Sequence, residues 1–263
     1  MKYLNARPLI HGWSGGVDFD HPSTLCQRLA NGELDVALVS SFEFLRNPIY
    51  RIVEDISISS EGPVYSVTVA HHGDFSEIRE IELDLASVTA VNLLRCLLAE
   101  LRLNLRLVPG TAGCQPAPTA SLPATSNARL LIGDQAIQFR QKYADELRFW
   151  DLGEQWKELT GLPFVYALWL IRPEVAEAKS MAQRLRVLRD QNLANLDDLI
   201  AERVASMSPV ALEEFDRGFL SRYFRKHLRF SFGKKEKQGL QRFADLCTKH
   251  GVLPRRDRTF SVV

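Results

Sequence analysis

The chain has 263 residues, of which 46% are hydrophobic and 25% charged, the composition of a folded protein with a sizeable core. Its 33 basic and 32 acidic residues leave a formal net charge of +1, so no overall field attracts nucleic acid or anionic lipid. No apolar run approaches the roughly 20 residues that span a bilayer, so composition argues against both a disordered chain and a membrane-spanning protein.

The first part of the chain alternates helical and strand patterns. Residues 22–30 begin with a proline and carry an apolar stripe at helical spacing, and Asn31-Gly32 supplies the stop, so we predict a helix there. The apolar run 34–39 is typical of a short buried strand. Further strands are predicted at 51–53, 56–59 and 64–70, because apolar and β-branched residues gather in these runs.

The middle of the chain contains strands, a long helix and one long loop. Residues 81–84 predict a strand, and the apolar face over about 89–101 predicts a helix. Residues 110–127 are rich in Pro, Ala, Ser and Thr without periodicity, and we predict an exposed, mobile loop. A strand follows at 129–132, a helix begins at 133–134, and 162–170 predicts a long apolar strand.

Beyond residue 171 the pattern is almost wholly helical. Helices are predicted near 175–190, 193–207, 209–215, 219–230 and 235–250. Residues 222–229 interleave basic and aromatic side chains, a pattern that can bind single-stranded nucleic acid. More often such a stretch is an amphipathic helix with one solvated face and one core face, and we favour that interpretation.

This order of elements predicts an α/β fold with two lobes and a ligand cleft between them, similar to a binding protein. The chain makes a first β/α lobe, crosses into a second, and returns to the first with helices. We place lobe 1 at residues 1–66 and 167–263 and lobe 2 at residues 67–166, with crossings near 64–70 and 164–170.

The sequence lacks the spacings of metal, redox and hydrolase sites. Cys26, Cys96, Cys114 and Cys247 have no zinc-site spacing, and apolar helical patterns around the first two predict buried, reduced thiols. The six histidines show no metal-ligand spacing either, and no GxSxG, P-loop or GxGxxG motif is present. Because no basic start with an apolar segment opens the chain, we expect a cytoplasmic protein.

Short polar motifs stand where predicted strands end, the position at which open α/β sheets bind small ligands. The amide of Asn5 can orient a hydroxyl or a carboxylate. Ser87 and Thr89 directly precede a helix, where hydroxyls and free N–H groups can hold an anion. The structural alternatives are a turn residue for Asn5 and helix caps for Ser87 and Thr89, and they stay open.

Two further motifs carry acidic groups. Gly62-Pro63 fixes a tight turn after Ser59, Ser60 and Glu61, and Glu61 can act as a general acid or base if burial raises its pKa. Most loop glutamates are solvated, which is the alternative for Glu61. Asp134 opens a predicted helix, so we expect a cap first and a ligand contact second.

These motifs together resemble the chorismate dehydratases of the futalosine route to menaquinone. The resemblance rests on YLNARPL at 3–9, GELDVALV at 32–39, SEGPVYSV at 60–67, LIGD at 131–134 and DLGEQWKELTGLPFV at 151–165. It implies a periplasmic-binding-protein-like fold of type II, used as a cofactor-free lyase. The implied reaction converts chorismate to 3-[(1-carboxyvinyl)oxy]benzoate and water.

The resemblance also implies roles for the polar residues. Asn5 and Ser60 are expected to be catalytic, with Asn5 positioning the departing hydroxyl or the proton acceptor. Two substrate carboxylates need hydroxyls and helix N-termini as anchors. The expected substrate-binding residues are Ser59, Glu61, Gly62, Ser87, Thr89 and Asp134. No metal, nucleic acid or membrane partner is expected, and the sequence leaves open a monomer or a homodimer.

The chain departs from the family pattern in two places. Members commonly have Ser-Arg-Thr-Ser where this chain has Ser87, Val88, Thr89 and Ala90, which bears on carboxylate affinity. Members also carry several residues of a first strand before the tyrosine-leucine-asparagine block, and here only Met1 and Lys2 precede it. The competing function is a receptor that closes on a small anionic aromatic or amino-acid-like ligand without turnover.

Overall fold

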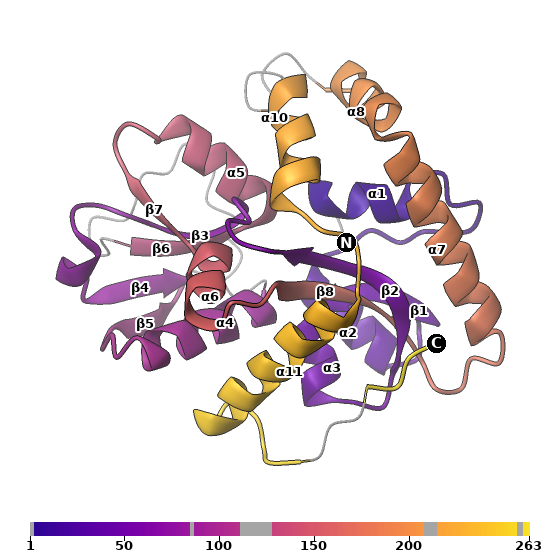
Figure 1. Cartoon of the computed structure of the whole chain (residues 1–263), viewed down its shortest axis with the longest axis horizontal. Coiled ribbons are helices and arrows are strands. Elements are labelled where there is room, and N and C mark those ends of the chain that lie inside the picture. The colour runs from indigo at the N-terminus through magenta and orange to yellow at the C-terminus, as the bar shows by residue number, and fades with distance from the viewer. Residues whose placement is uncertain (1–2, 85–86, 111–127, 208–214, 257–259) are drawn as a thin grey trace.

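The computed structural model describes residues 3–84, 87–110, 128–207, 215–256 and 260–263. Its strands form two separate sheets with helices packed around each of them (Figure 1). The two-lobed α/β arrangement predicted from the order of elements is therefore confirmed. Among these residues, no helix combines the length and the apolar character needed to cross a membrane.

The first sheet contains three antiparallel strands in the order β1-β8-β2. Its strands are β1 (Val36–Ser40), β2 (Arg51–Ser60) and β8 (Phe164–Ile171). Segments from both ends of the chain surround it: η1 (Leu4–Ala6), α1 (Arg7–Ile10), α2 (Pro22–Ala30), α3 (Ser41–Arg46), α7 (Ala178–Ala194) and α11 (Lys234–Lys249). Nearly every residue of β8 is buried, which explains its long apolar run.

The second sheet has five strands in the order β5-β4-β6-β3-β7. They are β3 (Val67–His71), β4 (Glu80–Leu83), β5 (Arg106–Pro109), β6 (Ala128–Ile132) and β7 (Arg148–Asp151). The helices of this lobe are α4 (Val88–Glu100), α5 (Gly133–Lys142) and α6 (Leu152–Thr160), with the short η2 at Phe75–Glu77. The other helices among the described residues are α8 (Leu196–Ala205), α10 (Arg217–Arg222) and the π-helical turn η3 (Tyr223–His227).

The chain crosses between the sheets twice. The first crossing joins the end of β2 at Ser60 to the start of β3 at Val67, next to the predicted boundary at 66/67. The second joins the end of α6 at Thr160 to β8, where Phe164 already pairs with Ser60 in the first sheet. This places the second crossing at residues 161–163, ahead of the predicted boundary at 166/167.

Several elements differ from their predictions for identifiable reasons. The strands predicted at 51–53 and 56–59 form one strand, β2, with an irregular register around Asp55, whose φ is 65°. The edge strands β5 and β7 were not predicted, because half-exposed four-residue strands carry little apolar alternation. The loop predicted at 110–127 and the helix predicted at 209–215 lie almost wholly outside the described residues.

The basic and aromatic stretch near the C-terminus has the two faces expected of packed helices. The aromatic rings of Tyr223 and Phe224 are buried, and Arg225 and Lys226 are exposed. The predicted single helix at 219–230 is instead α10 followed by the turn η3. Cys26 and Cys96 are buried free thiols, as predicted, whereas Cys114 lies outside the described residues.

Helix α11 packs closely against the second crossing through a glycine. A Cβ atom added at Gly239 would lie 2.0 Å from the carbonyl oxygen of Pro163. The same oxygen accepts a hydrogen bond from Trp156 Nε1 at 3.2 Å. The rings of Trp156, Phe164 and Phe243 pack around this point, so the glycine lets the helix reach the core of lobe 1.

We predict that Gly239→Ala destabilises the protein by about 1–3 kcal/mol, because a side chain is forced against a backbone carbonyl that cannot move freely. Thermal unfolding should then begin several degrees lower. Gly16→Ala is the matched control, since nothing lies within 4 Å of its added Cβ. Equal melting temperatures for Gly239→Ala and the unmodified protein would contradict the close packing.

Candidate functional site

Helices α4, α5 and α6 of lobe 2 begin at the contact with lobe 1. Each places an oxygen-bearing side chain in its first turn or at its N-cap: Thr89 on α4, Asp134 on α5 and Asp151 before α6. Each of these side chains binds a backbone N–H outside its own helix. Helix N-termini carry a partial positive charge and favour anionic groups. The contact between the lobes is therefore a polar surface on which side-chain oxygens at the helix starts hold backbone N–H groups of other elements.

Thr89 links α4 to the end of β1. Its hydroxyl accepts a hydrogen bond from the backbone N–H of Phe42 at 3.2 Å and also contacts the hydroxyl of Ser40. The Thr89 side chain is almost fully buried there. Ser87 is a helix cap, the structural alternative predicted for it. Its hydroxyl accepts a hydrogen bond from the N–H of Ala90 at 3.2 Å.

Asp134 holds the segment that carries Asn5. Its carboxylate accepts from the backbone N–H of Leu4 at 2.9 Å, and Tyr3 packs on Gly133, where an added Cβ would lie 2.8 Å from the ring. The expectation of a helix cap is wrong, because Asp134 makes no cap bond and reaches across the lobes instead. Burial raises the pKa of Asp134 to about 6, although the Leu4 N–H and Arg203 oppose the shift.

Asn5 has a polar atom without a partner. Its Oδ1 is buried and accepts no hydrogen bond from any residue that the structure describes. Buried acceptors are nearly always satisfied in folded proteins, and leaving one unpaired costs about 1–3 kcal/mol. An unpaired acceptor on a segment held by Asp134 is suited to a ligand that donates a hydrogen bond.

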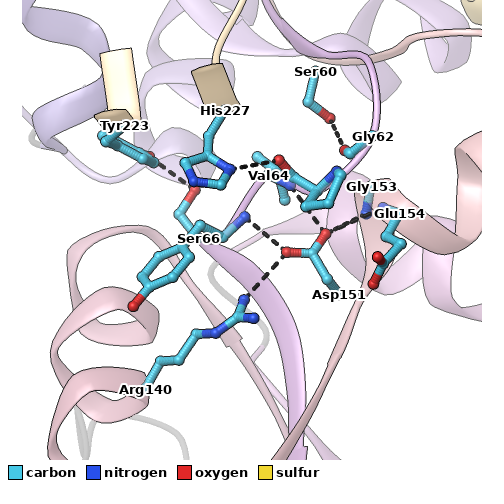
Figure 2. Close-up of polar contacts among 12 residues, drawn as sticks. Ser60, Gly62, Val64, Ser66, Arg140, Asp151, Gly153, Glu154, Tyr223 and His227 are labelled. Carbon is cyan, nitrogen blue, oxygen red and sulfur yellow. Dashed lines mark hydrogen bonds and ion pairs between the residues drawn. The ribbon is translucent and has the colours of Figure 1, made fainter. Parts of the chain in front are cut away.

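Asp151 joins the first crossing to helix α6 (Figure 2). Its carboxylate accepts from the backbone N–H groups of Val64 at 3.0 Å and Tyr65 at 2.7 Å, and from those of Gly153 and Glu154 at 3.0 and 3.2 Å. Arg140 approaches the same carboxylate at 3.4 Å. Sequence reasoning did not select Asp151, although an aspartate directly before a helical pattern is an N-cap signal.

The hydroxyl of Ser60 is satisfied inside this crossing. It donates to the carbonyl of Gly62 at 3.0 Å and lies 3.2 Å from the hydroxyl of Tyr166. Helix α6 packs so closely that a Cβ at Gly153 would lie 2.5 Å from the Gly62 carbonyl oxygen. Ser59 is also buried and pairs through its backbone with Arg229. Ser59 and Ser60 at the end of β2 are thus brought together with Gly62 in the crossing.

The turn η3 contacts the crossing through two side chains (Figure 2). The Tyr223 hydroxyl donates to Ser66 Oγ at 2.8 Å, and His227 Nδ1 lies 2.9 Å from the Pro63 carbonyl oxygen. These partners are more than 150 residues away in sequence, which is why local patterns did not reveal them.

Glu61 lies apart from the buried polar groups. Its side chain is at the surface, with Lys157 at 2.9 Å and Lys235 at 3.7 Å. The hydrogen bond from Lys157 is the largest cause that lowers the pKa of Glu61, with both lysine charges acting in the same direction. The pKa of Glu61 is therefore lowered by its lysine partners, whereas the predicted general acid or base role needs a pKa raised by burial.

A cavity of about 520 Å³ adjoins the segment that Asp134 holds. Leu4 and Asp134 belong to its wall, and α1, the chain after it and α8 supply the rest. Its lining residues are Tyr3, Leu4, Arg7, Ile10, His11, Gly12, Trp13, Val17, Phe19, Asp134 and Arg203. In the described part of the chain, no group of three or more His, Cys, Asp and Glu residues is placed to hold a metal ion.

Comparison with solved structures gives the fold. A protein from Archaeoglobus fulgidus matches with a TM-score of 0.67 at 21% identity, covering 90% of this chain and 86% of that one. The alkanesulfonate-binding protein of Xanthomonas axonopodis, bound to MOPS, matches with a TM-score of 0.62 at 17% identity. The match covers 94% of this chain and 86% of that one. The predicted periplasmic-binding-protein-like fold is confirmed.

Comparison of sequences gives the family. A curated chorismate dehydratase from Thermus thermophilus is 29% identical over 93% of this chain and 92% of its own length. A curated chorismate dehydratase from Campylobacter jejuni is 22% identical over 93% of this chain and 90% of its own length. A family model described as menaquinone biosynthesis matches residues 1–249. The chain belongs to this family of menaquinone biosynthesis proteins.

Proposed function

We propose that the protein dehydrates chorismate to 3-[(1-carboxyvinyl)oxy]benzoate, a step of menaquinone biosynthesis by the futalosine route. Both curated relatives carry that activity in their names and match over nine-tenths of this chain. The geometric observation that carries the proposal is the unpaired buried Oδ1 of Asn5 on a segment fixed by Asp134. A cytoplasmic location fits a biosynthetic step of this kind.

The reaction balances without an external reagent. The ring carbon that bears the enolpyruvyl ether loses a proton, and its neighbour loses hydroxide, so that one water forms. The electron pair of the broken C–H bond becomes the third double bond of the ring. Because no electrons leave the substrate, the reaction needs no oxidant or reductant, and aromatisation drives it forward.

Asn5 holds the departing hydroxyl in this proposal. An amide oxygen accepts a hydrogen bond from an alcohol and thereby fixes the direction of the C–O bond. Elimination is fastest when the breaking bonds are aligned with the ring π-system, so orientation lowers the barrier. The contact of Asp134 with Leu4 fixes the residue that precedes Asn5 and so limits its movement.

Hydroxyl groups at the start of α4 and at the end of β1 anchor a substrate carboxylate. Thr89 and Ser40 contact each other in this structure, and the same hydroxyls can instead donate to a carboxylate when the lobes admit substrate. Ser87 contributes by capping the helix that carries Thr89. We assign Ser60 and Gly62 to positioning of the crossing, since the Ser60 hydroxyl is already bound to the Gly62 carbonyl.

The proton goes first to a carboxylate of the substrate itself, and that carboxyl group then passes it to the departing hydroxyl, so that water leaves. Glu61 is paired with lysines at the surface, and the carboxylate of Asp134 is engaged with Leu4. An internal base held near the reacting C–H bond has a high effective concentration and needs no strong basicity when the product is aromatic. The protein then acts by orienting the substrate and excluding water.

Incubation of purified protein with chorismate tests this function. We expect the diene absorbance to fall while a product lighter by one water accumulates. Saturable thermal stabilisation by chorismate without turnover would instead support the alternative of a receptor. If the protein neither binds chorismate nor turns it over, both functions are contradicted.

We predict that Asn5→Ala lowers kcat for chorismate about 10- to 100-fold, because the departing hydroxyl loses its acceptor. The melting temperature should change little, since Asn5 Oδ1 accepts no hydrogen bond from the described residues. Asn31→Ala, at an exposed helix C-cap, is the matched control. Unchanged turnover in Asn5→Ala would remove Asn5 from the catalytic site.

Asp134 generates a prediction about pH. Its pKa is about 6 in the folded protein against the ordinary 3.8, so the folded state retains the proton more strongly than the unfolded state. Stability must therefore fall as pH rises from about 4 to about 6 and stay level above. Asp134→Asn keeps an acceptor for Leu4 but does not titrate.

Differential scanning fluorimetry of both proteins between pH 4 and 7 checks this prediction. Over that range, the melting temperature of the unmodified protein should fall by about 5 °C relative to Asp134→Asn. Parallel curves for the two proteins would mean that Asp134 titrates normally and is not buried against Leu4.

A further inference from the structure

The cavity beside η1 contains two guanidinium groups that face a common space. Arg7 lies on α1 and Arg203 on α8, and both belong to the wall of the 520 Å³ cavity. Burial is the larger cause that lowers the pKa of Arg7, and the charge of Arg203 is the next. Two like charges that line one cavity favour an anion in it.

Both guanidinium groups have hydrogen-bonding capacity to spare. The Nε atoms of Arg7 and Arg203 are buried, and neither donates to an acceptor among the residues with described positions. Buried donors of this kind are normally paired, and a carboxylate is the acceptor whose geometry matches a guanidinium.

The acidic groups around the cavity are engaged elsewhere. Glu202 raises the pKa of Arg7 through its charge, but its carboxylate pairs with His11 at 3.2 Å. Asp134 binds Leu4, and burial raises its pKa toward neutrality. Neither carboxylate supplies the acceptor that the two Nε atoms lack.

The rest of the wall suits a ring. Tyr3, Trp13 and Phe19 bring aromatic side chains to the cavity, and Phe19 is 53% exposed at its rim. A volume near 520 Å³ falls within the 300–1,000 Å³ typical of small-molecule sites. Aromatic walls with two cationic groups match a cyclic molecule that carries a carboxylate.

We propose that Arg7 and Arg203 bind a carboxylate of a cyclic, unsaturated acid in this cavity. The identity of that acid rests on the proposed function, under which it is the dicarboxylate substrate. Leu4 and Asp134 fix η1 and also line the cavity, so a ring held there lies beside the segment that carries Asn5. The arginines then set specificity for an acid over its neutral analogue.

Calorimetric titration with benzene-1,3-dicarboxylate, and with its neutral diamide, tests the proposal without turnover. The dicarboxylate should bind the unmodified protein, and the diamide should bind at least about tenfold more weakly. Arg203→Gln should weaken dicarboxylate binding about 10- to 100-fold and raise KM for chorismate. Arg242→Gln, an exposed arginine on α11, is the matched control and should leave both values unchanged.

The outcomes separate this site from the proposed function. Turnover of chorismate with unchanged KM and dicarboxylate affinity in Arg203→Gln would overturn the arginine site and leave the dehydratase intact. Dicarboxylate binding that depends on Arg203, without turnover of chorismate, would support the arginine site and contradict the dehydratase function. If Arg203→Gln does not fold, the comparison of dicarboxylate and diamide on the unmodified protein tests the proposal. Equal affinity for the two compounds, or no binding of the dicarboxylate, contradicts it.

Discussion

The carboxylate of Asp151 accepts hydrogen bonds from four backbone N–H groups, two in the first crossing and two at the start of α6. Because Asp151 is only 1% exposed, water cannot replace this acceptor, and each N–H left unpaired would cost about 1–3 kcal/mol. The crossing and the helix are therefore fixed to one another at a single point. The positions of Ser60, Ser66 and the turn between them follow from it.

Other contacts between the lobes use the same chemistry at neighbouring helices. Asp134 on α5 holds Leu4, and Thr89 on α4 holds the N–H of Phe42. In each case a helix N-terminus supplies the oxygen and the opposite lobe supplies a backbone donor. These contacts join the lobes through hydrogen bonds to backbone groups that come from distant parts of the sequence. The arginine-lined cavity adjoins one of these contacts, because Leu4 and Asp134 belong to its wall.

Local sequence was sufficient for the elements that bury a continuous apolar face. Helices α2 and α4 and strand β8 follow directly from spacing of apolar residues. The same reasoning placed polar candidates near strand ends but could not choose their partners. Asp134 has an acidic side chain at a helix start, and only the fold shows that it binds a backbone group 130 residues away instead of its own helix. Glu61 was ambiguous for the same reason, since Lys157 and Lys235 come from distant helices.

A crystal structure of the protein with 3-[(1-carboxyvinyl)oxy]benzoate bound is the most direct test of a single substrate site at the η1 segment. The ring should lie beside Leu4 and Asp134, with a carboxylate within hydrogen-bond distance of Arg203 and with Asn5 Oδ1 facing the ring carbon that has lost its hydroxyl. Product bound elsewhere, with Asn5 Oδ1 and the arginine Nε atoms still unpaired, would contradict both the assignment of Asn5 and the location of the site.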